Sequence, residues 1–220
     1  MQKKVFLDGE ADAWYRRNSV SIADRDRHVS DPIMTEFERF GIRARNVLEI
    51  GCSNGWRLNA LKNTWTNCNA YGIDPSSEAV SNSKNDYPGI NCQVGTADAL
   101  PYADSTFDLV IFGFCLYLVD RNDLFRIAAE ADRVLCDGGI LTILDFYSEI
   151  PYKNRYTHKE NMLSFKMDYS RMFTWNPAYR LYSNRVMDHN GSGFGDPDNN
   201  ISVTILKKDI KNSFPFNPFI

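Results

Sequence analysis

The feature that most constrains this chain is an apolar segment with one acid near its end and a turn that carries two glycines, Val47-Leu-Glu-Ile-Gly-Cys-Ser-Asn-Gly55. Its apolar residues are typical of a buried strand in a parallel sheet. Gly51 and Gly55 allow a tight turn and a close approach to a ligand. The helix expected over residues 56–65 would direct its N-terminal amides toward this turn. The pattern predicts a ligand-binding crevice at the carboxyl end of the strand.

The glycine spacing distinguishes this turn from two common nucleotide sites. It reads G-x-x-x-G, unlike the G-x-G-x-x-G of dinucleotide sites, and no G-K-[ST] triphosphate loop is present. The pattern E-x-G-x-x-x-G resembles the cofactor-binding turn of the class I S-adenosylmethionine-dependent methyltransferases, in their small-molecule, type 11-like branch. The resemblance implies that S-adenosylmethionine is the cofactor and that the turn binds it through Glu49, Gly51, Cys52, Ser53 and Gly55.

A second short strand, expected over residues 70–74, also ends in an acid. A carboxylate at a strand tip can accept hydrogen bonds from both hydroxyls of a ribose. The resemblance gives Asp74 this role and places Pro75 and Ser76 beside the cofactor. The alternative is that Asp74 caps the helix that follows.

The segment after the third expected strand, residues 90–94, carries a further motif. It reads Asp98-Ala-Leu-Pro-Tyr-Ala-Asp-Ser-Thr-Phe-Asp108 and resembles a signature of the same methyltransferase branch. The resemblance implies that Ala97, Asp98 and Ala99 contact the adenine. Asp98 would accept from the amino group, and the amide of Ala99 would meet a ring nitrogen. A plain surface loop is the alternative.

The fourth expected strand, residues 109–112, leads to the place where the methyl donor and the acceptor should meet. We expect Phe114 and Cys115 to contact the cofactor and Tyr117 to contact the substrate. An aromatic face can stabilise a sulfonium by cation–π attraction, although such rings can equally be core. Enzymes of this fold that methylate the exocyclic amine of a base or a protein glutamine carry [DN]-P-P-[YFW] here. The sequence Phe-Gly-Phe-Cys departs from that motif and disfavours such acceptors.

Strand and helix patterns alternate from residue 46 to residue 146, which predicts a parallel sheet with right-handed crossovers. Alternating segments at 178–187 and 200–206 predict an antiparallel hairpin. A helix is expected over 124–135, ended by Asp137-Gly-Gly139, with a strand over 140–146. The expected fold is therefore α/β: a Rossmann-like, doubly wound seven-stranded sheet, mostly parallel, with an antiparallel C-terminal hairpin.

Two segments outside the alternating pattern are expected on the substrate side. Residues 1–45 form an N-terminal helical cap, which either packs on the sheet or forms a lid over the cofactor. The methyltransferase domain is expected over 46–220, with a variable substrate-side insert at 147–176 and the hairpin at 178–206. The insert is too long and too aromatic for a passive connection.

Candidate substrate contacts come from both segments. Trp14, Tyr15 and Arg17 lie in a piece of the cap that resembles N-terminal segments of methyltransferases from bacterial sugar-biosynthesis clusters. Tyr156 is the candidate from the insert.

No catalytic residue is fixed in the resembled family, because methyl transfer from a sulfonium mainly requires alignment and exclusion of water. A hydroxyl acceptor would benefit from a general base, and histidine suits that task near neutral pH. His158, in the aromatic insert, is the first candidate and His28 the second, with His189 as the remaining histidine. A carboxylate or neutral amine acceptor would need no base.

The composition limits the classes of molecule that this protein is expected to bind. A net charge of −3 without a long basic run gives no electrostatic signature of nucleic-acid binding. Five cysteines without C-x-x-C spacing predict reduced thiols, no metal site and a cytoplasmic protein. No apolar run reaches the ~18 residues of a membrane span. The expected partner is a small molecule, such as a sugar or secondary metabolite, methylated at oxygen or nitrogen, and the oligomeric state stays open.

Two other function classes remain. A protein of the same fold could bind S-adenosylmethionine without transferring methyl, as a pseudoenzyme or accessory partner. A nicotinamide-dependent oxidoreductase is disfavoured, because the G-x-G-x-x-G pattern is missing.

Overall fold

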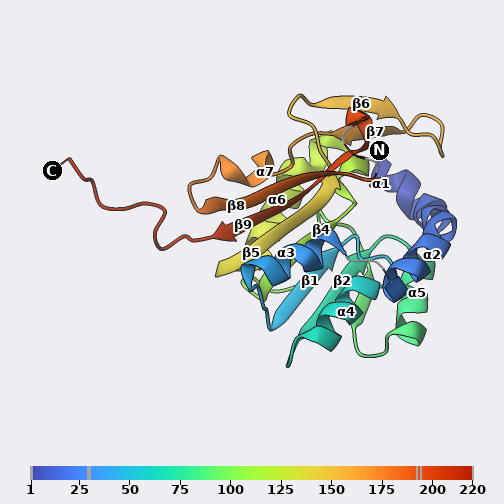
Figure 1. Cartoon of the computed structure of the whole chain (residues 1–220), viewed down its shortest axis with the longest axis horizontal. Coiled ribbons are helices and arrows are strands. Elements are labelled where there is room, and N and C mark those ends of the chain that lie inside the picture. Colours follow the sequence, from blue (N-terminus) through green and yellow to red (C-terminus); the bar gives the residue numbers. More distant parts are fainter. Residues whose placement is uncertain (1, 29–30, 192, 194, 220) are drawn as a thin grey trace.

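Within residues 2–28, 31–191, 193 and 195–219, which the computed structural model describes (for residues 21–28 the backbone alone), the chain folds around a seven-stranded sheet. The strand order is β3-β2-β1-β4-β5-β9-β8 (Figure 1). The strands are β1 (Asn46–Ile50), β2 (Asn69–Asp74), β3 (Asn91–Val94), β4 (Phe107–Gly113), β5 (Leu135–Phe146), β8 (Tyr179–Asp188) and β9 (Asn200–Lys208). The predicted Rossmann-like fold is confirmed.

The five N-terminal strands of the sheet run parallel. β1 pairs with β2 and β4, β2 with β3, and β4 with β5. Ile50 lies opposite Ile73 of β2 on one side and Phe112 of β4 on the other. The carboxyl ends of these strands therefore meet at one edge of the sheet, which brings Gly51 and Asp74 side by side.

The C-terminal edge of the sheet is antiparallel, because β9 pairs antiparallel with both β5 and β8. The predicted C-terminal hairpin is therefore confirmed. β5 begins at Leu135 and not at the predicted Ile140, since Leu135 already pairs with Phe107 of β4. The prediction that Asp137-Gly-Gly139 ends the preceding helix is wrong for the same reason: α6 (Leu124–Val134) ends before it.

Helices cover both faces of the sheet. On one face lie α3 (Pro32–Phe40), α4 (Trp56–Thr64) and α5 (Ser77–Asp86), and on the other lie α6 and the short α7 (Arg171–Thr174). Alternate residues of β4 divide between the two layers. Leu109 and Ile111 pack with α3, α4 and α5, and Val110 and Phe112 pack with α6 and α7. Because both faces of this strand are buried, its sequence is almost continuously apolar.

The chain begins with three consecutive helical segments, α1 (Gln2–Val5), η1 (Phe6–Glu10) and α2 (Ala11–His28), here called the N-terminal helices. A left-handed residue, Gly9 at φ 126°, bends the chain inside η1. α2 contacts α4 and α5, so the N-terminal helices lie beside the carboxyl edge of β1 and β2 (Figure 1). They continue further than the predicted helix-prone piece around Trp14.

The predicted insert contains a second, two-stranded sheet. β6 (Tyr152–Arg155) pairs antiparallel with β7 (Leu163–Lys166), and this pair is here called the insert hairpin. β7 contacts the short helix η2 (Leu116–Leu118). Figure 1 shows the insert hairpin and α1 at the same end of the molecule. Two further 3-10 turns complete the chain, η3 (Arg121–Asp123) and η4 (Pro197–Asn199).

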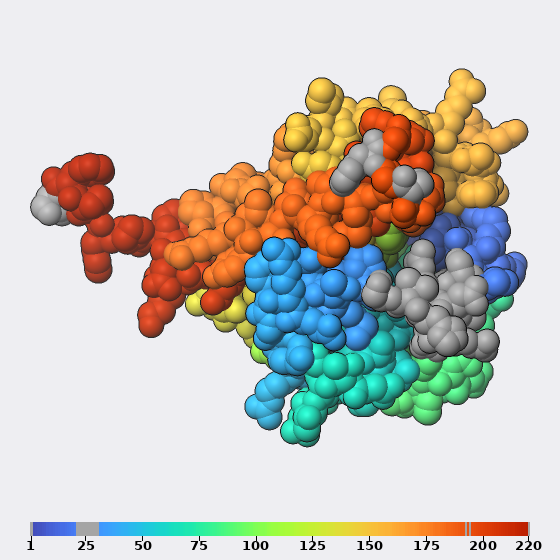
Figure 2. All heavy atoms as spheres, viewed as in Figure 1, coloured from blue at the N-terminus to red at the C-terminus, as the bar shows by residue number. Residues whose placement is uncertain are grey.

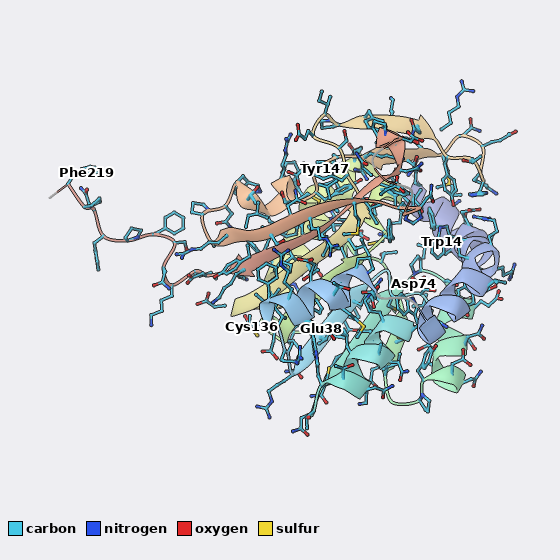
Figure 3. The ribbon with its side chains drawn as sticks, viewed as in Figure 1. Trp14, Glu38, Asp74, Cys136, Tyr147 and Phe219 are labelled. Carbon is cyan, nitrogen blue, oxygen red and sulfur yellow. The ribbon has the colours of Figure 1, made fainter. Side chains whose placement is uncertain are left out.

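After β9 the chain extends away from the body, as Figures 1 and 2 show. Phe216 in this tail is fully exposed. Trp14 and Asp74 lie near each other in the body, far from Phe219 in the tail (Figure 3). Among the described residues, none of the helices combines the length and the apolar character needed to cross a bilayer.

Candidate functional site

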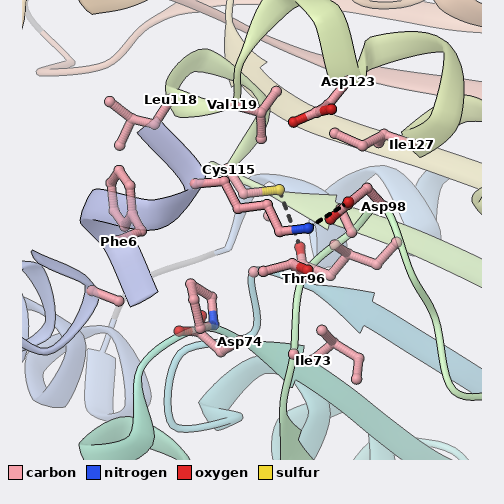
Figure 4. A pocket seen from close by; sticks show the side chains of 18 of the residues that line it. Phe6, Ile73, Asp74, Thr96, Asp98, Cys115, Leu118, Val119, Asp123 and Ile127 are labelled. Atoms are coloured by element: carbon pink, nitrogen blue, oxygen red, sulfur yellow. Dashed lines mark hydrogen bonds and ion pairs between the residues drawn. The ribbon is translucent and has the colours of Figure 1, made fainter. Parts of the chain in front are cut away.

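A pocket of about 900 Å³, which includes space open to solvent, lies at the carboxyl edge of the parallel strands (Figure 4). Its size suits a small-molecule ligand. Its floor comes from the ends of β1, β2 and β4, at Ile50, Gly51, Ile73, Asp74, Gly113, Phe114 and Cys115. Its wall is the loop after β3, at Gly95, Thr96, Ala97 and Asp98. Its roof is formed by the N-terminal helices, at Lys3, Phe6, Ala11 and Trp14.

The turn after β1 requires its two glycines. Both adopt left-handed backbone, with φ of 77° at Gly51 and 79° at Gly55. A Cβ added to Gly51 would lie 2.7 Å from the Cβ of Cys115, and one added to Gly55 would overlap Ile90. The amides of the turn serve the fold, since Gly51 N donates to the carbonyl oxygen of Ile73 at 2.8 Å. The turn therefore holds β1, β2 and the start of α4 close together under the pocket.

Asp74 ends β2 and its carboxylate lines the pocket (Figure 4). Its Oδ2 accepts from Ser53 N at 2.8 Å and its Oδ1 from Ser76 N at 2.9 Å. The alternative of Asp74 as the helix cap is wrong, because α5 is capped by Ser76, whose Oγ accepts from Ala79 N. Burial raises the pKa of Asp74 to about 6, against the lowering effect of the two N–H donors. Pro75 lines the pocket beside it.

A buried ion-pair network lies behind the glycine turn. Arg57 of α4 donates to Glu49 Oε1 through Nη1 and to Asp31 Oδ2 through Nε at 3.0 Å. All three side chains are almost fully buried. Among the described residues, Glu49 Oε2 has no hydrogen-bond partner. Glu49 is absent from the pocket lining but lies just behind it, since a Cβ on Gly113 would come 2.5 Å from Glu49 Oε1.

Arg57 and Asp31 were not among the predicted site residues. The sequence did contain a signal for a nearby cation, because Glu49 lies inside an apolar strand and a buried acid needs a positively charged partner. Arg57 is in the first turn of the helix that follows that strand. Asp31 in addition caps α3, where its Oδ1 accepts from Met34 N at 3.0 Å.

The loop after β3 carries the predicted adenine contacts. Ala97 and Asp98 line the pocket, whereas the amide of Ala99 donates to the carbonyl oxygen of Thr96 at 3.3 Å. Asp98 Oδ2 accepts from Lys3 Nζ at 2.6 Å. Burial alone would raise the pKa of Asp98, but the hydrogen bond from Lys3 holds it below its usual value. Lys3 was not anticipated from the sequence.

At the end of β4, the predicted cofactor contacts Phe114 and Cys115 both line the pocket. Phe114 also belongs to an aromatic cluster. The rings of Phe114 and Phe146 lie 5.6 Å apart, and those of Tyr117 and Phe146 lie 5.1 Å apart. The indole Nε1 of Trp14 donates to Tyr117 Oη at 3.3 Å. The cluster thus joins the floor of the pocket to the N-terminal helices.

Asp145 fixes the loop that carries this cluster. Its carboxylate, almost fully buried, accepts from Leu116 N and from Phe146 N, each at 2.8 Å. Burial raises the pKa of Asp145 to about 7. Arg121 holds the same loop from the other side, because its Nη2 donates to the carbonyl oxygen of Val119 at 2.7 Å. The loop is therefore held in place by the buried Asp145 carboxylate and by the partly buried Arg121.

The predicted substrate contacts divide into two groups. Arg17 donates to Glu10 Oε1 at 2.5 Å and to Tyr156 Oη at 3.2 Å, which connects α2 to the insert hairpin. Trp14 lines the pocket, whereas Tyr117, Arg17 and Tyr156 are not among the lining residues. Tyr117 and Tyr156 pack together with Trp14 beside the roof. Tyr15 points elsewhere: it is buried against α4 and α5, and its Oη accepts from Asn82 Nδ2 at 3.0 Å.

The histidines are placed differently from expectation. His158 is exposed in the turn of the insert hairpin, with its ring 5.4 Å from that of Tyr156, and it does not line the pocket. The side chain of His28 lies outside the described residues. His189, which follows β8, has its ring 5.4 Å from that of Phe114 and 5.6 Å from that of Phe146. Only the antiparallel edge of the sheet brings it there, so no local sequence signal could have selected it.

Comparison with known proteins shows that the chain is similar to methyltransferases. Residues 48–143 match the model of a methyltransferase domain. The chain is 29% identical over 106 residues to a fatty-acid O-methyltransferase of Mycolicibacterium smegmatis, a match that covers 47% of this chain and 38% of that protein. It is 34% identical over 104 residues to a ubiquinone/menaquinone biosynthesis C-methyltransferase of Desulfotalea psychrophila, covering 46% and 42%. The chain thus spans about two fifths of the length of these curated relatives.

Solved structures share the fold over most of the chain. A Burkholderia thailandensis 1,6-didemethyltoxoflavin-N1-methyltransferase, with S-adenosylhomocysteine bound, superposes with a TM-score of 0.69 at 14% identity, covering 94% of this chain and 87% of that one. An S-adenosylmethionine-dependent methyltransferase of Methanosarcina mazei gives a TM-score of 0.61 at 20% identity, covering 83% and 99%. At these identities the likeness shows the fold.

Proposed function

Because the chain belongs to the class I S-adenosylmethionine-dependent methyltransferases, we propose that it binds S-adenosylmethionine in the pocket and transfers a methyl group to a small molecule. The observation that carries the proposal is the Asp74 carboxylate, which lines the pocket at the end of β2 beside the glycine turn. A strand-end carboxylate in this position can accept from both hydroxyls of a ribose.

The residues present fit the chemistry of this cofactor. The described lining residues include four carboxylates, those of Asp74, Asp98, Asp120 and Asp123, and one ammonium, that of Lys3. A pocket with this charge favours a cationic ligand that carries hydroxyl and amino donors. The donor and acceptor set therefore matches a sulfonium-bearing nucleoside.

Each part of the pocket then has a role in this proposal. Asp74 binds the ribose, and Ala97 and Asp98 contact the adenine. The glycine turn and Cys115 bind the amino-acid end, with Cys52, Ser53 and Gly55 shaping the turn. When bound, S-adenosylmethionine supplies a methyl group that is already activated for in-line displacement. The protein contributes alignment and exclusion of water.

The acceptor side is the aromatic cluster between the floor and the roof. Phe114, Tyr117 and Trp14 would orient the acceptor and exclude water, and Arg17 and Tyr156 would fix the roof above it. For a hydroxyl acceptor we assign proton removal to His189, which does not itself line the pocket but packs on Phe114, which does, in preference to the exposed His158. A sugar or secondary metabolite, methylated at oxygen or nitrogen, is the proposed acceptor class. The free thiols favour a cytoplasmic location.

Calorimetric titration with S-adenosylhomocysteine, and separately with NADH, tests the cofactor assignment. We expect micromolar binding of the first and none of the second. Binding of NADH alone would overturn the proposal in favour of an oxidoreductase. A subsequent acceptor screen, sugars first, read out by the mass of the methylated product, separates the enzyme from a cofactor-binding pseudoenzyme or accessory protein. The pseudoenzyme would bind S-adenosylhomocysteine and methylate no acceptor.

A further inference from the structure

The roof of the pocket includes a lysine bonded directly to one of the proposed cofactor residues. Lys3 Nζ lies 2.6 Å from Asp98 Oδ2, and Figure 4 marks this ion pair by the dashed line that ends on Asp98. The backbone amide of Lys3 also donates to Asp120 Oδ2 at 3.2 Å. All three residues line the pocket. Lys3 is therefore attached to the wall through its side chain and to the opposite loop through its backbone.

Gln2 fixes the helix that carries Lys3. Its side chain is buried, and its Nε2 donates to the carbonyl oxygen of Leu118 at 2.7 Å. Its Oε1 accepts from Leu163 N of β7, also at 2.7 Å. A buried amide that is bonded at both ends has one position of low energy, because leaving either partner unpaired is costly. The backbone position of Lys3 is therefore fixed by the packing of Gln2.

We propose that Lys3 and Asp98 form a latch that holds the roof over the pocket, and that the adenine amino group displaces Lys3 when the cofactor binds. This proposal rests on the proposed function, because it assigns Asp98 to the adenine. An ammonium and an amino group are both hydrogen-bond donors, so the two compete where a buried carboxylate has room for only one of them. The Asp98 side chain is 6% exposed, which leaves little room for a second donor beside Lys3.

The ion pair between Lys3 and Asp98 can open easily. The Lys3 side chain is 39% exposed, so its ammonium can move into solvent without a burial cost. An ion pair with one partner this exposed contributes modestly, and its loss should change cofactor affinity by about two- to fivefold. The adjacent Lys4 provides a matched comparison. Its side chain is 84% exposed, and its ion pair, with Asp8 at 3.7 Å, lies on the surface.

The direct test is chemical acetylation of the full chain followed by mass spectrometry of the modified lysines. The rate at Lys3 is measured relative to Lys4, without ligand and with saturating S-adenosylhomocysteine. The latch predicts that the ligand increases modification of Lys3, and that Asp98→Asn increases it without any ligand. An unchanged or lower rate at Lys3 with ligand would overturn the proposal.

Calorimetry of Lys3→Gln, with Lys4→Gln as control, gives a second readout. S-adenosylhomocysteine should bind Lys3→Gln about two- to fivefold more tightly than the wild type, and Lys4→Gln unchanged. Equal or weaker binding by Lys3→Gln would reject the latch while leaving the proposed function intact. Failure of all three proteins to bind the ligand would reject the cofactor assignment. The contact between Lys3 and Asp98 would then be judged from the acetylation of Asp98→Asn alone.

Discussion

The floor and the roof of the pocket are assembled in different ways. The floor follows from the parallel register of β1, β2 and β4, together with a turn whose left-handed backbone requires two glycines. The roof depends on side-chain contacts between distant segments, such as Trp14 with Tyr117 and Arg17 with Tyr156. A backbone-built floor tolerates few substitutions, whereas a roof of side-chain contacts can lose one contact and keep its position.

The two regions also differ in how they use arginine. In the floor, the Arg57 side chain is 5% exposed and holds two buried acids. In the roof, the Arg17 side chain is 32% exposed and joins Glu10 to Tyr156. Water can partly replace the Arg17 guanidinium as a partner of Glu10, but it cannot replace Arg57 as the partner of two buried acids. The floor should therefore show the larger responses to substitution.

The largest expected effect is on stability, in Arg57→Ala. The change leaves Glu49 and Asp31 buried without their cation, which should lower the free energy of unfolding by about 3–5 kcal/mol. Urea denaturation monitored by circular dichroism measures it. Arg16→Ala removes an ion pair with Glu78 at the surface and should change little. A loss in Arg57→Ala no larger than in Arg16→Ala would contradict the contrast between floor and surface.

Gly51→Val should remove cofactor binding from a folded protein. The left-handed backbone at φ 77° and the overlap with Cys115 together should weaken binding of S-adenosylhomocysteine by about 2–4 kcal/mol. Gly138→Val is the matched control, because Gly138 has φ of 80° with no atom within 4 Å of the added Cβ. The control carries the same backbone cost and should bind normally. Normal binding by Gly51→Val would sink the turn assignment.

Asp74→Ala should weaken binding of S-adenosylhomocysteine by about 1–3 kcal/mol, the cost of leaving polar partners unpaired. Isothermal titration calorimetry measures the change. Asp104→Ala serves as the control, since the Asp104 side chain is 78% exposed and pairs with Arg133. A change in Asp74→Ala of only a few tenths of a kcal/mol would exclude the ribose role.

Acidification should move cofactor affinity and stability in opposite directions. Burial raises the pKa of Asp74 to about 6 and that of Asp145 to about 7. A carboxyl group whose pKa is higher in the folded than in the unfolded protein binds its proton more tightly when folded. This contribution to stability is complete below the unfolded-state pKa and is lost as the pH rises through the folded-state pKa. The protein should therefore gain stability from pH 7 to pH 5. Affinity for S-adenosylhomocysteine should fall by up to about tenfold between pH 6 and pH 5, because the ribose hydroxyls need the Asp74 carboxylate.

Titrations and urea midpoints at pH 5, 6 and 7 measure both trends. Asp74→Asn should flatten the pH dependence of the affinity. A pH dependence that survives in this variant would place the titrating group elsewhere.

The smallest expected effect is in the roof, in Tyr156→Phe. This change removes a hydroxyl that accepts from Arg17 at 3.2 Å and donates to Glu10 at 3.3 Å. Stability should fall by about 1 kcal/mol, measured by urea denaturation, with cofactor affinity unchanged. A loss of affinity as large as in Asp74→Ala would mean that roof and floor act as one unit.

The floor could be predicted from the sequence because its signals are local. An apolar strand, a glycine turn and an acid at the next strand end are each contained in a few consecutive residues, and their meeting follows from the parallel sheet. The roof and the ion pairs could not be predicted this way. Lys3 reaches Asp98 and His189 reaches Phe114 only through the tertiary fold. Local signals also failed at Leu135, where strand pairing with Phe107 overrides the expected end of the helix.

The bond between Gln2 and Leu163 has a consequence for the order of folding. These residues are 161 positions apart in the sequence, and contacts of such separation carry a high loop-closure entropy and form late. During synthesis α1 emerges before β1 to β5, and its partner in β7 follows only after these strands have been made. The bond that anchors α1 over the pocket can therefore form only after the strands of the floor have been synthesised.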